Sequence, residues 1–127
     1  MDTLSLLLCI LAINSTAFSK TLSQINGRII GGKVAHPLQF PYAAAIYVQT
    51  ADSRYFCGGT LLSNQWILTA GQCVDGATLF QIYLGSISLV GDDPNRLVLA
   101  TSTHVLHPEY NASTLENDIG LIELRMP

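Results

Sequence analysis

Residues 57–73 read CGGTLLSNQWILTAGQC, and this stretch decides the fold. Two short apolar runs within it, Thr60–Leu62 and Trp66–Thr69, predict β-strands. Ser63-Asn64 separates the runs with residues that favour turns. The paired glycines after the first cysteine allow another backbone to pass close by. The stretch therefore predicts closely packed β-structure enclosed between two cysteines.

The same pattern of short strands extends over the rest of the chain. Each run is rich in apolar and β-forming residues, and turn residues such as Asp75-Gly76 and His107-Pro108 separate the runs. Outside the N-terminal segment, no window sustains an apolar period of 3.6 residues with helix caps. Regular short strands favour a β-barrel or a sandwich. The further predicted strands are Ala43–Val48, Leu79–Leu84, Arg96–Ala100 and Ile119–Leu124.

Composition limits the classes of function. The 127 residues suffice for one ordinary domain, and 49% of them are apolar while 12% are charged. The formal net charge is −3, and the basic residues form no cluster. Nucleic acid and membrane surfaces are therefore not predicted as partners.

The N-terminus predicts export from the cell. Leu4–Ile13 is almost wholly apolar, too short to span a bilayer, and is followed by small residues suited to cleavage. We assign residues 1–19 to a signal peptide, although Asp2 departs from the usual basic start. A buried N-terminal helix is the alternative. The predicted location is secreted and extracellular.

Removal of the signal segment takes Cys9 with it and leaves Cys57 and Cys73 as a pair. In an oxidising compartment such a pair favours a disulfide, which over this loop length stabilises by about 3 kcal/mol. A metal site is the competing interpretation, but two cysteines without a second pair of ligands make a poor zinc motif. We therefore predict a disulfide, and no metal or cofactor.

The cysteine segment resembles that of trypsin-like serine proteases, which runs from Cys-Gly-Gly-Ser-Leu-Ile to Leu-Thr-Ala-Ala-His-Cys. Gln72 occupies the place of the catalytic histidine. Arg28-Ile29-Ile30-Gly31-Gly32 resembles the activation junction of the family's zymogens. The resemblance implies cleavage between Arg28 and Ile29, after a short propeptide at residues 20–28.

Asn117-Asp118-Ile119-Gly120-Leu121-Ile122 resembles the family motif Asn-Asp-Ile-Ala-Leu-Leu. The resemblance gives Asp118 the role of the triad aspartate, which orients the imidazole. It covers residues 29–127 and implies an all-β fold, the N-terminal six-stranded antiparallel barrel of a chymotrypsin-like double barrel. The second barrel, which carries the nucleophilic serine and the specificity pocket, is expected to be absent.

Gln72 decides the predicted chemistry. A general base must take a proton and return it, whereas a glutamine amide does not titrate in the accessible pH range. Loss of the base costs roughly 10⁶-fold in rate, a magnitude borrowed from triad proteases and not from this chain. His36, His104 and His107 are the other histidines, and we expect them to be exposed or structural.

The predicted function is a secreted serine endopeptidase homologue that is catalytically inactive, with a binding or decoy role. Its partners by resemblance are protein or peptide substrates or protease inhibitors. The alternatives are a fragment of an active serine endopeptidase and a non-functional truncated product. Asn111-Ala112-Ser113 is also a sequon, so Asn111 is a candidate glycosylation site.

Overall fold

The computed structural model describes residues 31–125. The predicted signal peptide, the propeptide and the Arg28–Ile29 junction lie outside these residues. Every strand falls within one compact unit, Val34–Pro127. Among the described residues, no helix has the length and apolar character needed to cross a membrane.

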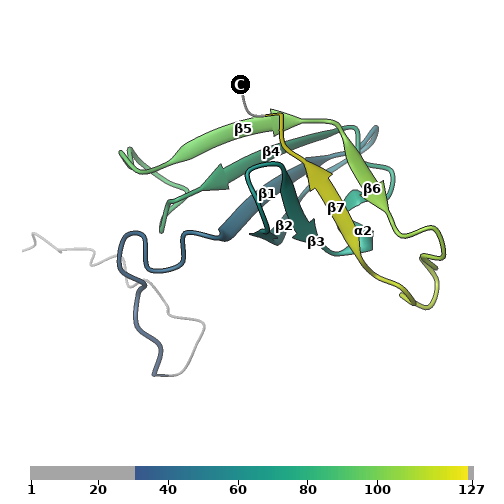
Figure 1. The fold of residues 1–127 in the computed structure, drawn as a ribbon, viewed down its shortest axis with the longest axis horizontal. Helices are drawn as coiled ribbons and strands as arrows, with labels where there is room; N and C mark the ends of the chain where they lie inside the picture. Colours follow the sequence, from purple (N-terminus) through teal and green to yellow (C-terminus); the bar gives the residue numbers. More distant parts are fainter. Residues whose placement is uncertain (1–30, 126–127) are drawn as a thin grey trace, which may run out of the picture. The chain divides into compact units, whose positions relative to one another are not determined.

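One antiparallel sheet carries the fold (Figure 1). Its order is β5-β4-β1-β2-β3-β7-β6, and a single helical turn, α2 (Gly71–Val74), follows β3. The strands are β1 (Ala43–Gln49), β2 (Arg54–Leu61), β3 (Trp66–Thr69), β4 (Leu79–Leu84), β5 (Leu97–Thr101), β6 (His104–Leu106) and β7 (Gly120–Glu123).

The two edge strands, β5 and β6, are neighbours in the chain, separated only by Ser102 and Thr103. β5 pairs with β4 while β6 pairs with β7, and the Glu123 amide also donates to the Thr103 carbonyl at 3.0 Å. A single bent strand therefore joins the two sides of the curled sheet. The predicted all-β antiparallel barrel is confirmed, and its six strands become seven where this strand bends.

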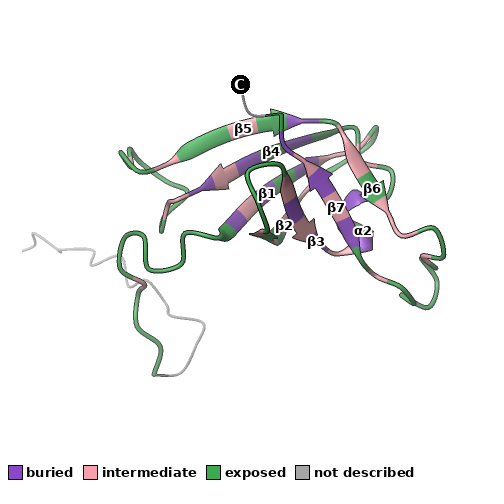
Figure 2. Ribbon diagram, in the orientation of Figure 1, coloured by how far each residue is buried: buried purple, intermediate pink, exposed green. Residues whose placement is uncertain are grey.

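Alternation of apolar residues builds the core. In β1, Ala44, Ile46 and Val48 point inward, and in β4 Phe80 and Ile82 do the same. Figure 2 shows this buried stripe along the strands, with exposed residues in the connections. Complete burial of one such large side chain stabilises by about 1.5–3 kcal/mol. The side chains with essentially no exposure are Ile46, Val48, Ile67, Val74, Phe80, Ile82 and Ile122.

The predicted bounds of β3 and β4 match the structure, whereas the predicted start of β2 is wrong. We predicted a strand from Thr60, but β2 begins at Arg54 because residues 54–60 pair with β1, from Gln49↔Arg54 to Ala43↔Thr60. The close approach expected at the paired glycines occurs at Gly59 alone. A Cβ there would lie 2.8 Å from side-chain atoms of both Ile46 and Ile67, while Gly58 has open space.

Gly120 gives a stability prediction at the junction of β7 and α2. A Cβ at Gly120 would lie 2.5 Å from Cγ2 of the fully buried Val74. Gly120→Ala is therefore expected to lower the free energy of unfolding by about 1–3 kcal/mol through overpacking. Val74→Ala should make this substitution much less costly, because it removes the clashing methyl groups. Urea unfolding of both single variants and the double variant measures this coupling; additive losses would contradict it.

Candidate functional site

The site begins at the disulfide between Cys57 in β2 and Cys73 in α2, whose Cα atoms are 6.2 Å apart. The predicted pairing is confirmed. The bond ties the single turn of α2 to the sheet, and the Asp75 amide donates to the Gly71 carbonyl at 2.9 Å to close that turn. Gln72, between two buried neighbours, is exposed.

Gln72 contacts Asp118, which lies 46 positions later in the chain, through two hydrogen bonds. The backbone amide of Gln72 donates to Asp118 Oδ1 at 2.7 Å, and the side-chain Nε2 donates to Oδ2 at 3.2 Å. Both carboxylate oxygens therefore bind the same residue. The structure brings together the two residues singled out in the sequence as the base position and the triad aspartate.

The loop before Asp118 is fixed by its neighbour Asn117. Asn117 adopts a positive φ of 55°, which asparagine tolerates better than most residues. Its Nδ2 donates to the Glu109 carbonyl at 2.9 Å, and its own carbonyl accepts from the Ile119 amide at 2.7 Å. These bonds set the direction in which the Asp118 side chain leaves the backbone.

Two tyrosines adjoin α2, and sequence reasoning missed both. The Tyr55 hydroxyl donates to the Gln72 carbonyl at 3.3 Å. The Tyr110 ring lies against Gly71, where a Cβ would be 3.0 Å from its Cδ2 atom and 3.2 Å from Asp118 Oδ1. Alternation along β2 hints at the position of Tyr55, but no pattern in the sequence indicates its partner.

Both tyrosines have pKa values above the usual range. Desolvation raises the pKa of Tyr55, with a contribution from the negative charge of Asp75. Desolvation is also the first cause for Tyr110, followed by the charges of Asp118 and Asp75.

These shifts predict a loss of stability at alkaline pH. A tyrosine ionises near pH 10 in the unfolded chain and at higher pH when folded. The stability that the two neutral phenols contribute is thus complete below about pH 10 and falls as pH rises through the folded values. We expect phenolate absorbance of the folded protein to develop later than that of the urea-unfolded protein. Tyr55→Phe should remove one late transition, and coincident folded and unfolded curves would contradict the assignment.

The rings of two of the three described histidines contact other groups. His104 Nδ1 lies 3.1 Å from the Ser102 carbonyl, and its ring packs edge-on against Phe80. His107 Nδ1 accepts from the Glu109 amide at 3.2 Å. At His36, the backbone amide donates to the Gln39 side chain. Within residues 31–125, none of the three hydrogen-bonds to Asp118.

Gln72 takes part in this arrangement through hydrogen bonds alone, because its amide does not titrate in the accessible pH range. The amide of Gln72 has one acceptor oxygen and donates through Nε2 to Asp118, so Oε1 remains as an acceptor. Residues 31–125 contain no cluster of three or more histidine, cysteine or acidic side chains suited to a metal ion.

Asn111 is exposed, and its Oδ1 accepts from the Ser113 amide at 2.9 Å and the Thr114 amide at 3.3 Å. The sequon thus lies in a surface turn, and glycosylation of Asn111 stays a prediction.

Comparison with known proteins identifies relatives of this chain. The family model described as Trypsin matches residues 29–127. Brachyurin of Leptuca pugilator is 37% identical over 99 residues, which cover 78% of this chain and 42% of the relative. Kallikrein-14 of Homo sapiens is 36% identical over 121 residues, covering 94% of this chain and 44% of the relative.

Among solved structures, HL collagenase superposes with a TM-score of 0.68 at 36% sequence identity. The match covers 78% of this chain and 42% of that structure. The chain thus spans less than half the length of the relatives that it matches.

Proposed function

Because the chain belongs to the trypsin family of serine proteases, we propose that it is a secreted homologue that binds proteins without hydrolysing them. Proteases of this family act on protein substrates. In this proposal the chain has the fold of these proteases but lacks the proton transfer that hydrolysis needs. Export is supported by the apolar segment at residues 4–13 and by a disulfide, which persists in oxidising compartments. Cleavage between Arg28 and Ile29 and a glycan at Asn111 are parts of the same proposal.

One observation carries the proposal: the side chain bonded to Asp118 is the amide of Gln72. In a working triad the aspartate fixes the imidazole tautomer and stabilises the imidazolium that forms. An amide forms no such cation at neutral pH, so Asp118 accepts a hydrogen bond from the Gln72 side chain but stabilises no positive charge there. A serine hydroxyl placed at Gln72 would therefore keep its proton.

The retained framework supports a binding role. The disulfide, the loop bonds of Asn117 and the close contact of Asp118 with Gln72 hold the surface around α2 in one conformation. A surface that is ordered beforehand loses less entropy on association. Such a surface suits a decoy for protease inhibitors.

A pair of inhibitors tests the decoy role on the secreted protein that carries this chain. A canonical inhibitor binds a protease surface reversibly, whereas a serpin forms its covalent adduct only after the enzyme has begun acyl transfer. We expect a reversible complex with a canonical inhibitor and no detergent-stable adduct with a serpin. A trypsin-family protease that hydrolyses a test ester serves as the control for adduct formation. A covalent serpin adduct would overturn the proposal, and the absence of any complex would remove the decoy role.

The geometry of Asp118 favours a second candidate, a segment of an active serine endopeptidase. Both oxygens of its carboxylate face residue 72, as an orienting aspartate requires. This candidate needs a base other than Gln72, and the rings of His104 and His107 have other partners. It predicts a bell-shaped dependence of hydrolysis on pH, which the first proposal does not.

A further inference from the structure

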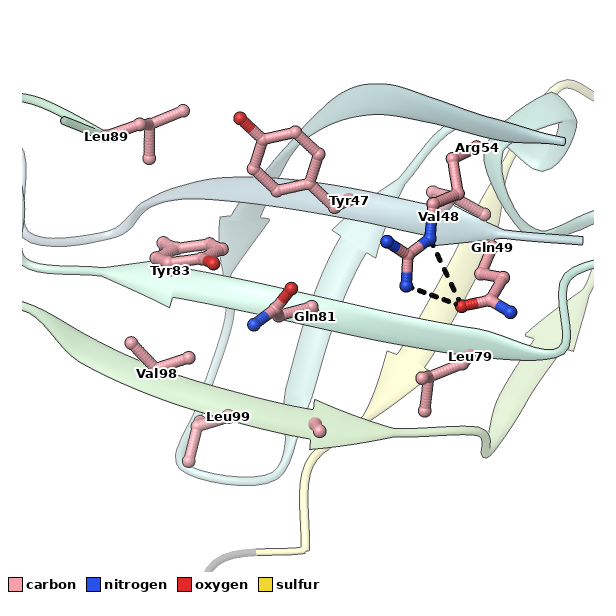
Figure 3. Close-up of a pocket in the computed structure, with 11 residues that line it drawn as sticks. Tyr47, Val48, Gln49, Arg54, Leu79, Gln81, Tyr83, Leu89, Val98 and Leu99 are labelled. Carbon is pink, nitrogen blue, oxygen red and sulfur yellow. Dashed lines mark hydrogen bonds between the residues drawn. The ribbon is translucent and has the colours of Figure 1, made fainter.

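A pocket of about 590 Å³ lies on the outer face of the barrel, over β1, β2, β4 and β5 (Figure 3). Its volume is within the usual range for ligand sites, about 300–1,000 Å³. Gln72 and Asp118 are not among the residues that line it. Its role can therefore be tested separately from that of the candidate site.

One end of the pocket is apolar and aromatic. The Tyr47 ring packs edge-on against Tyr83, with centroids 5.7 Å apart, and against Phe56 on its other side at 5.4 Å. Val98 is the cross-strand partner of Tyr83, and Leu89 lines the same pocket (Figure 3). Tyr47 is 41% exposed and Val98 47%, so this end presents apolar surface to solvent. Exposed aromatic rings held by their neighbours are typical anchors of protein interfaces.

The other end carries a fixed cation. Gln49 Oε1 accepts from Arg54 Nε at 3.3 Å and from Nη2 at 2.9 Å, so two of the five guanidinium N–H groups hold the side chain in place. Three N–H groups remain for a ligand. No acidic residue lines the pocket. This end therefore complements a carboxylate, which a guanidinium binds in a fork geometry.

The register of the strands sets the distance between the two ends. Tyr47 and Gln49 are two residues apart on the same face of β1, which corresponds to about 7 Å along the strand. Arg54 is the cross-strand partner of Gln49, as Phe56 is of Tyr47. Residues i and i+2 of an extended peptide have the same spacing and also point to one side.

We propose that this pocket binds an extended peptide segment of a partner protein that carries an aromatic or large aliphatic residue and an Asp or Glu two positions away. The apolar side chain packs against Tyr47, Tyr83 and Leu89, and the carboxylate accepts from Arg54. The chain itself has a net charge of −3, so the local positive charge of Arg54 directs an acidic segment to this face.

The test uses the full chain labelled with ¹⁵N and two capped probes, acetyl-Gly-Phe-Ser-Glu-Gly-amide and acetyl-Gly-Glu-Ser-Phe-Gly-amide. The two orders allow for either direction of the bound segment. We expect at least one probe to shift the backbone amide signals of Tyr47, Gln81 and Val98 in a saturable manner. Added salt should weaken binding, because the contact to Arg54 is between charges near the surface.

Arg54→Gln is expected to weaken binding about tenfold or more, the range for loss of a charged hydrogen bond. Arg125→Gln removes the same charge from another exposed position and should leave binding unchanged. Replacing Glu by Gln in the probe gives the same comparison with the protein unaltered, even if the Arg54 variant unfolds. Equal affinity for the Glu and Gln probes, shifts confined to other strands, or no saturable binding at millimolar probe would overturn the proposal.

Discussion

Gln72→His is expected to raise ester hydrolysis by about 10⁶-fold in a chimaera that joins residues 29–127 to the remaining part of brachyurin. The magnitude is borrowed from other triad proteases, in which loss of the base costs this much. Brachyurin suits the chimaera because it matches this chain over 99 residues at 37% identity. The parent chimaera should keep only the residual catalysis of about 10³–10⁴-fold over water that binding and oxyanion contacts supply.

The gain depends on Asp118 being in place already. Gln72 Nε2 donates to Asp118 Oδ2 at 3.2 Å, and an imidazole N–H at position 72 can take over this bond. The second ring nitrogen is then free to accept a proton. Gln65→His adds a histidine at an exposed position and should give no activity. A folded Gln72→His chimaera that stays inactive would show that Asp118 is not positioned to orient a base.

The introduced imidazole also has a physical signature that does not depend on turnover. The Asp118 carboxylate should raise its pKa above the ordinary value of about 6.5. Because the folded value exceeds the unfolded one, the added stability is complete below about pH 6.5 and disappears as pH rises through the folded pKa. NMR titration of the ring protons measures this value. A pKa at or below the ordinary value would contradict close contact with Asp118.

Removal of the disulfide is the second large effect. The loop that Cys57 and Cys73 close spans a sequence separation of 16, for which the chain-entropy model gives about 3 kcal/mol of stabilisation. We expect the double variant Cys57→Ser, Cys73→Ser to lose about that much in free energy of unfolding. Gln72 adjoins Cys73, so its bonds to Asp118 should also loosen.

Urea unfolding with and without a reductant separates the bond from the substitutions. The reductant should destabilise the parent by a similar amount and leave the double variant unchanged. A parent that is insensitive to reductant would indicate that the bond adds little. In that case the packing around Val74 and Gly59, and not the cross-link, holds α2 to the sheet.

Local sequence patterns predicted the bounds of a strand correctly where pairing with a neighbouring strand did not extend it beyond its run of β-forming residues. Trp66–Thr69 and Leu79–Leu84 consist of β-forming residues bounded by turns, and their ends agree with the structure. β2 was predicted too short, because Arg54, Cys57 and two glycines lie in it before Thr60. Only the ladder with β1 shows that these residues form a strand.

The candidate site was predictable only in part, because some of its contacts depend on tertiary structure. The resemblance to trypsin-like proteases gave Gln72 and Asp118 and their expected proximity. Asn117 contributes through its positive φ, and Tyr55 contributes through a hydrogen bond to a residue 17 positions later in the chain. Both features depend on tertiary structure. The outer pocket could not be predicted either, because it requires the cross-strand pairing of Gln49 with Arg54.

The proposal that this family member does not hydrolyse proteins is tested most directly by a fluorophosphonate, which modifies a serine only where a base activates it. The protein that contains this chain is incubated with the reagent, and its intact mass is measured beside a brachyurin control. Peptide mapping of the same sample confirms glutamine at position 72. We predict an unchanged mass for the protein and one adduct per molecule for the control. One adduct per molecule on the protein containing Gln72 would contradict the proposal.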